Sequence, residues 1–128
     1  MPHTIHYNPE ADIIEIKVEG NVDRDKLKEI FSQGVQLANK KKCFRFLNDF
    51  REATIDLSTM DIFYLPEVLS SISDPLGIPA YRFRRALVIA PEYTRDAGFA
   101  EDVTVNRGQH AKFFQDAEEA KKWVLKKW

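Results

Sequence analysis

The sequence predicts an α/β fold with a mostly parallel sheet, an N-terminal β-hairpin and the element order ββαβαβαβα. Two patterns alternate along the chain. Segments of alternating or continuous apolar residues are typical of strands, and segments whose apolar residues recur every three or four positions are typical of helices. A hydrophobic fraction of 44% that includes nine Phe, four Tyr and two Trp is enough to build a core. The length of 128 residues suits one domain, which we expect to span residues 1–128.

The composition argues against several classes of partner. Nineteen basic residues nearly balance 20 acidic ones, and a net charge of −1 gives no overall field for nucleic acid or anionic lipid. The longest aliphatic run, residues 86–90, is far shorter than the ~20 residues of a membrane span, and no signal-peptide pattern opens the chain. One cysteine, Cys43, makes neither an internal disulfide nor a cysteine-based zinc site. We expect a cytoplasmic protein that binds no nucleic acid and has no stable membrane insertion.

The chain begins with a predicted hairpin. Residues 3–7 and 12–19 both alternate between apolar and polar side chains, and the turn-forming residues 8–11 join them. Strands of a sheet covered on both faces are apolar throughout, whereas this hairpin has one charged face. We therefore expect the helices to lie mainly on one face of the sheet, at least beside the hairpin.

A first helix and a buried strand follow. Asp23 is the predicted N-cap of an amphipathic helix that ends in Lys40-Lys41-Lys42, where cations complement the helix dipole. The alternative for the three lysines is a phosphate-binding patch. Residues 43–50 are rich in aromatic residues and predict a buried strand with Asn48 and Asp49 at its carboxyl end.

The middle of the chain predicts a second helix and a second buried strand. Ser58 and Asp61 have the spacing of a capping box, and apolar residues continue to Ile72. Pro66 should kink this helix or divide it in two, because proline lacks the N–H and clashes with the preceding turn. Residues 84–90 then predict a strand that is apolar on both faces at its centre.

The last third predicts a helix, a short strand and a final helix. Residues 94–107 form the helix, which Gly108 ends; its inward-facing residues should be Phe99, Val103 and Ala100. Residues 111–114 form the strand. Asp116 and Glu119 make a second capping box, before a helix whose buried stripe is Ala117, Ala120, Trp123 and Val124.

These features together resemble a known family. They are the hairpin, the capped helix after Gly20, the strand ending in Asp49, the cap at Ser58-Thr59, and the closing strand and helix of residues 113–123. The chain resembles the SpoIIAA-like STAS domains, and more particularly the uncharacterised bacterial branch of that superfamily. The resemblance covers essentially the whole chain but contains no sharp catalytic motif. It implies a βα superhelix with sequential strands, and a non-enzymatic regulatory or protein-interaction module like the anti-sigma factor antagonists.

The resemblance also implies a regulatory serine. In STAS regulators a serine at the start of the second helix, directly preceded by aspartate, is phosphorylated by a partner kinase, and the added charge blocks binding to that partner. The matching stretch here is Asp56-Leu57-Ser58-Thr59-Met60. Ser58 and Thr59 are the candidate phosphorylation and partner-binding residues. This stretch departs from the family's pattern, in which small residues including glycine follow the serine: Leu57 separates Asp56 from Ser58, and no glycine follows. The alternative is therefore that Ser58 only caps the helix.

Chemistry-bearing residues are otherwise few. Asp49 is the best candidate for a catalytic acid, and Arg51 follows it two residues later in the sequence. General acid–base catalysis also needs a partner within reach. The alternative role for Asp49 is loop capping or an ion pair with Arg51. The three histidines lack metal-ligand spacing, and no glycine-rich phosphate loop occurs. We expect no catalytic set, no cofactor and no metal, and an enzyme using Asp49 with a histidine is the least favoured hypothesis.

Two basic segments have two interpretations each. Residues 81–85 interleave Tyr and Phe with Arg, as in grips on single-stranded nucleic acid, but surface arginines leading into a strand are favoured. Residues 121–128 could rest on a membrane surface, or simply place lysines at the end of a terminal helix.

Two functions therefore stay open. The first is a regulatory module with an unidentified protein partner. The second is a carrier of a small apolar ligand or lipid, in which the segment 62–72 closes over a pocket as a flap. Because the middle strands are apolar on both faces, we also expect a homodimer that buries the uncovered sheet face or an adjacent edge.

Overall fold

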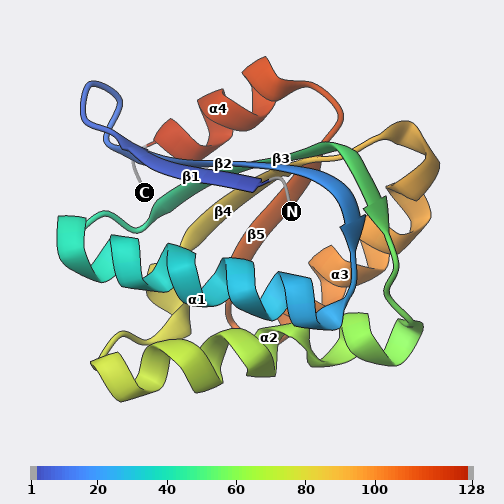
Figure 1. Ribbon diagram of the computed structural model, residues 1–128, viewed down its shortest axis with the longest axis horizontal. Helices are drawn as coiled ribbons and strands as arrows, with labels where there is room; N and C mark the ends of the chain where they lie inside the picture. The colour runs from blue at the N-terminus through green and yellow to red at the C-terminus, as the bar shows by residue number, and fades with distance from the viewer. Residues whose placement is uncertain (1–2, 127–128) are drawn as a thin grey trace.

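The structure, a computed structural model, describes residues 3–126 (Figure 1). Five strands form one sheet: β1 (His3–Asn8), β2 (Ile13–Val22), β3 (Arg45–Ile55), β4 (Arg84–Val88) and β5 (His110–Phe114). Their order across the sheet is β1-β2-β3-β4-β5, the same as along the chain. β1 runs antiparallel to β2, and every later neighbour is parallel. The predicted class, hairpin and sequential strands are confirmed.

Three helices cover one face of the sheet, and a fourth packs against the other (Figure 1). The three are α1 (Arg24–Lys41), α2 (Thr59–Ser73) and α3 (Thr94–Asn106); the fourth is α4 (Ala117–Leu125). Short 3-10 turns, η1 (Asp74–Leu76), η2 (Ala80–Arg82) and η3 (Pro91–Tyr93), lie in the connections. No helix within residues 3–126 is both long enough and apolar enough to cross a membrane.

The core has two parts, one on each face of the sheet. On the α1–α3 face, Ile16, Phe46 and Phe83 pack in the larger cluster. On the other face, Ala86 and Val88 of β4 pack against Ala120 and Val124 of α4. Ile13 of β2 belongs to the same smaller cluster. The homodimer prediction rests on apolar side chains of the middle strands that the sequence predicts to be uncovered, and α4 covers them. The homodimer stays a prediction, without that support.

The helix caps follow the sequence closely. The Asp23 side chain accepts a hydrogen bond from Lys26 N, and Ser58 and Asp61 form the reciprocal capping box of α2. Asp116 also caps α4, but its side chain accepts from Glu118 N at 2.9 Å, so the expected box with Glu119 is replaced by a bond one residue earlier.

Several boundaries differ from the prediction. β3 does not end at Asp49 but continues to Ile55, because β2 also continues past a register shift and pairs there, with Val22 opposite Ile55. α2 is not divided at Pro66: the ring is fully buried and the Pro66 carbonyl accepts a hydrogen bond from Gln109. Phe99, expected to face inward, is 38% exposed.

Candidate functional site

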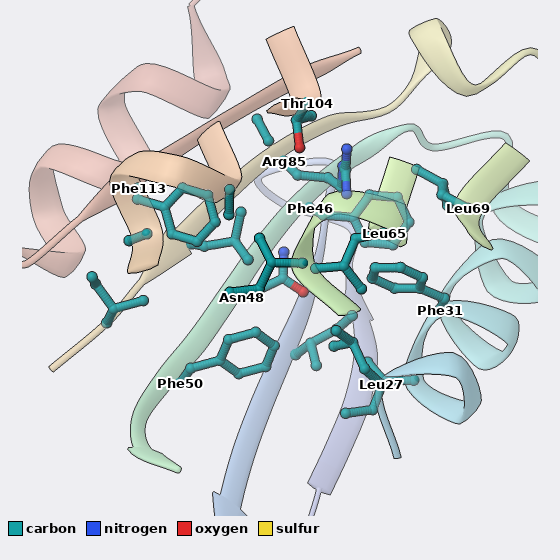
Figure 2. Close-up of a pocket in the computed structure, with 18 of the residues that line it drawn as sticks. Leu27, Phe31, Phe46, Asn48, Phe50, Leu65, Leu69, Arg85, Thr104 and Phe113 are labelled. Atoms are coloured by element: carbon teal, nitrogen blue, oxygen red, sulfur yellow. The ribbon is translucent and has the colours of Figure 1, made fainter. Parts of the chain in front are cut away.

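A cavity of about 110 Å³ lies between the sheet and helices α1, α2 and α3 (Figure 2). Most of its lining is aliphatic or aromatic and includes Leu27, Phe31, Phe46, Phe50, Leu65 and Leu69. The amphipathic faces of the helices and the inward residues of β3 supply these side chains. The cavity is therefore an apolar space inside the larger core cluster.

A few polar groups reach this apolar space. Asn48 on β3 is buried, and its Nδ2 donates to the Ala86 carbonyl at 3.3 Å. Thr104 is buried on α3, and Asp96 lines the cavity from the same helix. The fourth group is Arg85 on β4, whose side chain Figure 2 shows beside Thr104. Apolar walls with a small number of convergent polar groups are typical of ligand sites.

Arg85 is the most unusual of these groups. Its Nη2 donates to Gln109 Oε1 at 3.1 Å, while its Nε is buried without a hydrogen-bond partner among the described residues. Burial lowers the pKa of Arg85 to about 10. That value is still well above neutral pH, so a positive charge faces an apolar space.

Gln109 fixes this arginine to the helix layer. Gln109 is buried, and its Nε2 donates to the Pro66 carbonyl at 2.9 Å and to Ser70 Oγ at 3.3 Å. One amide thus joins the guanidinium of Arg85 on β4 to two residues of α2. The orientation of Arg85 and the position of α2 are consequently coupled.

The predicted regulatory residues lie outside the cavity. Asp56, Ser58 and Thr59 are exposed around the start of α2. Ser58 Oγ accepts from Asp61 N at 3.0 Å, and Ser58 N donates to Asp61 Oδ2 at 2.9 Å. The hydrogen bond from the Ser58 backbone lowers the pKa of Asp61. The Ser58 hydroxyl is therefore engaged as a cap while remaining at the surface.

Asp49 forms an ion pair within β3. Arg51 donates from Nε to Asp49 Oδ1 at 2.9 Å and from Nη2 to Oδ2 at 2.8 Å, and this contact lowers the pKa of Asp49. Successive strand residues point to opposite faces, so Asp49 lies on the face opposite Asn48 and Phe50, which line the cavity. Asp49 is not at a strand end, and the structure does not bring it together with Ser58.

Part of the basic segment 81–85 lines a polar groove on the rim of the sheet together with residues 42–45, whereas residues 121–126 do not line it. Lys42, Arg45 and Arg82 line it, and Arg82 lies over the Phe44 ring with its Cζ 4.4 Å from the ring centroid. The expectation that the arginines of residues 81–85 all lie at the surface is wrong for two of them: Arg84 is 7% exposed, and Arg85 lines the cavity, because alternation along β4 turns both into packed layers.

Cys43 is a buried thiol just before β3. Its Sγ donates to the Asp12 carbonyl at 3.4 Å, and burial raises the pKa of the thiol. Within residues 3–126, no three His, Cys, Asp or Glu side chains gather in a group that could hold a metal ion.

Three cavity residues, Asn48, Arg85 and Thr104, and Gln109, which bonds to Arg85, carry roles that the sequence did not predict. From the sequence, Asn48 is only the polar end of a predicted strand. Arg85 did leave a signal, since it is a charged residue flanked by Phe83 and Leu87 in an apolar strand. Gln109 and Thr104 left none, because polar residues near a helix end are ordinary surface residues.

No family model and no curated protein matches this chain. Solved structures do resemble it. The anti-sigma factor antagonist SpoIIAA in its unphosphorylated form aligns with a TM-score of 0.53 at 12% identity, over 96% of this chain and 97% of that one. An uncharacterized protein of the DUF3478 family with a SpoIIAA-like fold, from Shewanella loihica, aligns with a TM-score of 0.58 at 18% identity, over 95% and 93% of the two chains. This protein therefore has the SpoIIAA-like fold.

Proposed function

We propose that this protein binds a small apolar molecule in the cavity between the sheet and α1–α3. The observation that carries the proposal is the cavity itself, about 110 Å³ of apolar space inside a folded core. Protein interiors are close-packed, and each unfilled volume lowers stability. An engineered apolar cavity of about 150 Å³ binds benzene, so a ligand body of about five carbon atoms suits this one.

The proposed role is binding without catalysis. Asn48 and Thr104 can orient a ligand, while the remaining walls exclude water from it. A long lipid chain would need α2 to move away, because Leu65 and Leu69 of that helix close the cavity. We place this role in the cytoplasm, where the single thiol of Cys43 remains reduced.

Native mass spectrometry of the protein purified from its own host tests the proposal. We expect a reproducible small bound mass. Ala100 lines the cavity from α3, and Ala100→Leu adds three carbon atoms to that wall, so this variant should lose the bound mass. Ala117→Leu makes the same change on α4, on the other face of the sheet, and should retain it. Recovery of the wild-type protein without any bound mass would contradict the proposal.

A second candidate function is a regulatory module that binds a protein partner through the start of α2. The matching fold of the anti-sigma factor antagonist supports it. So do three large apolar side chains in the first two turns of α2, since Met60, Phe63 and Tyr64 are 57%, 38% and 44% exposed. Exposed apolar groups that gather in one place are typical of protein contacts. Phosphorylation of Ser58 would add negative charge at this surface.

Affinity purification from the host, with wild-type and variant protein as bait, tests this second function. Ser58→Asp should change the amount of a captured partner without unfolding the domain. Ser71→Asp is the matched control, since Ser71 is also exposed on α2 but lies in its last turn. Equal capture by all three baits would remove the phosphoserine switch.

A further inference from the structure

We propose that the ligand of the cavity is a short monocarboxylate, with its carboxylate bound to Arg85 and its apolar body among the aromatic and leucine side chains. This inference rests on the proposed binding function and adds the chemical class of the ligand. Four observations carry it: the direction of Arg85, its unfilled hydrogen-bonding capacity, its uncompensated charge and the size of the cavity.

The strand pattern directs Arg85 into the helix layer. Ala86 and Val88 pack against α4, so Arg85 and Leu87, which alternate with them, face the cavity and α1–α3. In Figure 2 the Arg85 side chain projects from β4 toward the lining residues, with Thr104 next to it. Its placement is fixed by the parity of a central strand.

The guanidinium has donors to spare. It carries five N–H groups, and the structure gives it one hydrogen bond, from Nη2 to Gln109 Oε1. The Nε atom is buried and unpartnered among the described residues. A carboxylate accepts two parallel hydrogen bonds from one arginine, which would satisfy this group. Gln109 is itself held by the Pro66 carbonyl, so the guanidinium is oriented in advance.

The charge of Arg85 has no counterion in the described part of the chain. None of the ion pairs among residues 3–126 includes it, and burial alone shifts its pKa. Asp96 also lines the cavity, from the first turn of α3, but it is not within ion-pair distance of Arg85. A partly buried cation without an anion is unfavourable, and a bound carboxylate would supply the missing negative charge.

The dimensions limit the rest of the ligand. About 110 Å³ is less than the ~150 Å³ that holds benzene. Figure 2 places Arg85 and Thr104 toward one end of the cavity, and Leu27 and Phe50 toward the other. In proportion to the six carbon atoms of benzene, this volume suits an apolar body of about four or five carbon atoms, so the four-carbon tail of a five-carbon acid would occupy it with the carboxylate at Arg85.

Pentanoate and pentanamide form a matched pair of probes, because they share their shape and differ in charge. We would titrate each into the purified protein and follow backbone amide shifts by NMR. Pentanoate should bind the wild type at least about tenfold more tightly than pentanamide does, because its carboxylate makes a charge-assisted hydrogen bond. Arg85→Met should abolish that preference while still binding pentanamide. Arg85→Lys keeps the charge and should keep part of the preference.

Arg51→Met serves as the control, since it removes an arginine that is paired with Asp49 on the opposite face. It should leave the preference unchanged. Equal binding of both probes to the wild type, or a preference that survives in Arg85→Met, would overturn the carboxylate inference and leave the binding function standing. If neither probe shifts the cavity resonances at millimolar concentration, the binding function itself is refuted, and the carboxylate inference falls with it.

Discussion

Replacing Arg85 with methionine should make the free protein more stable. In the absence of a ligand, Arg85 keeps a positive charge in a mostly apolar cavity, and its Nε lacks a partner among the described residues. Methionine preserves an unbranched apolar side chain of similar reach and removes the charge. Substitutions of this kind, at sites built for a ligand, commonly exchange function for stability.

The size of the effect follows from two opposing contributions. Burial lowers the pKa of Arg85 from 12.5 to about 10, which corresponds to a cost of about 3 kcal/mol in the folded state. Removing the arginine leaves Gln109 Oε1 without its donor, which costs about 1 kcal/mol. Because the Arg85 side chain is only partly buried, we expect a net gain of about 1–2 kcal/mol. For a domain of 128 residues that raises Tm by roughly 3–8 °C.

Urea denaturation followed by circular dichroism measures this difference. The folded-state pKa of Arg85 is lowered, so its cost is fully present below about pH 10 and declines only as the pH rises through that value. The gain in Arg85→Met should therefore be constant from pH 6 to pH 9. Pentanoate at a fixed millimolar concentration should stabilise the wild type more than Arg85→Met, because the variant lacks the charged partner and binds this probe more weakly. A variant that is less stable than the wild type by about 1 kcal/mol or more would refute the reasoning. That threshold is about the cost of one lost hydrogen bond. Such a loss would mean that the hydrogen bonds and charge of the guanidinium are already satisfied in the free protein.

Three further outcomes are expected elsewhere in the chain. Ser58→Ala should lower the free energy of unfolding by about 1 kcal/mol, measured by urea denaturation, because it removes the N-cap of α2. Arg51→Met should cost less than about 1 kcal/mol at pH 7; since Arg51 lowers the folded-state pKa of Asp49, that loss should shrink as the pH falls below about 4. Cys43 should react with iodoacetamide at pH 8 at least about tenfold more slowly in the native protein than in urea, because burial raises its pKa and covers its sulfur.

Local signals predicted the fold well because each of them acts over only a few residues. Alternation identified the hairpin, and the side chains of Asp23 and Ser58 marked two helix starts to the residue. The boundaries that failed depend on partners distant in sequence. The extension of β3 to Ile55 follows from its pairing with Val22, which no local pattern in residues 45–55 reveals.

Most of the candidate site depends on such distant partners. The central strand β4 is apolar on both faces, so its sequence does not say which parity faces α1–α3 and which faces α4. Without that parity, the sequence does not say whether Arg84 or Arg85 faces α1–α3, although Arg85 alternates with the apolar Phe83 and Leu87. The structure separates them: Arg84 donates to carbonyls at the end of α4, whereas Arg85 points into the cavity.

Gln109 shows why a polar residue of no evident pattern can decide what a site does. The Gln109 amide donates to the Pro66 carbonyl of α2 and accepts from Arg85 at the same time. A proline that the sequence predicted would interrupt a helix is thus one end of a hydrogen-bonded bridge that orients the partly buried cation of Arg85. Since α2 also contributes Leu65 and Leu69 to the cavity, any ligand that pairs with Arg85 acts on the same helix that closes over it. The proline matters here for the carbonyl it offers to Gln109 more than for the N–H that it lacks.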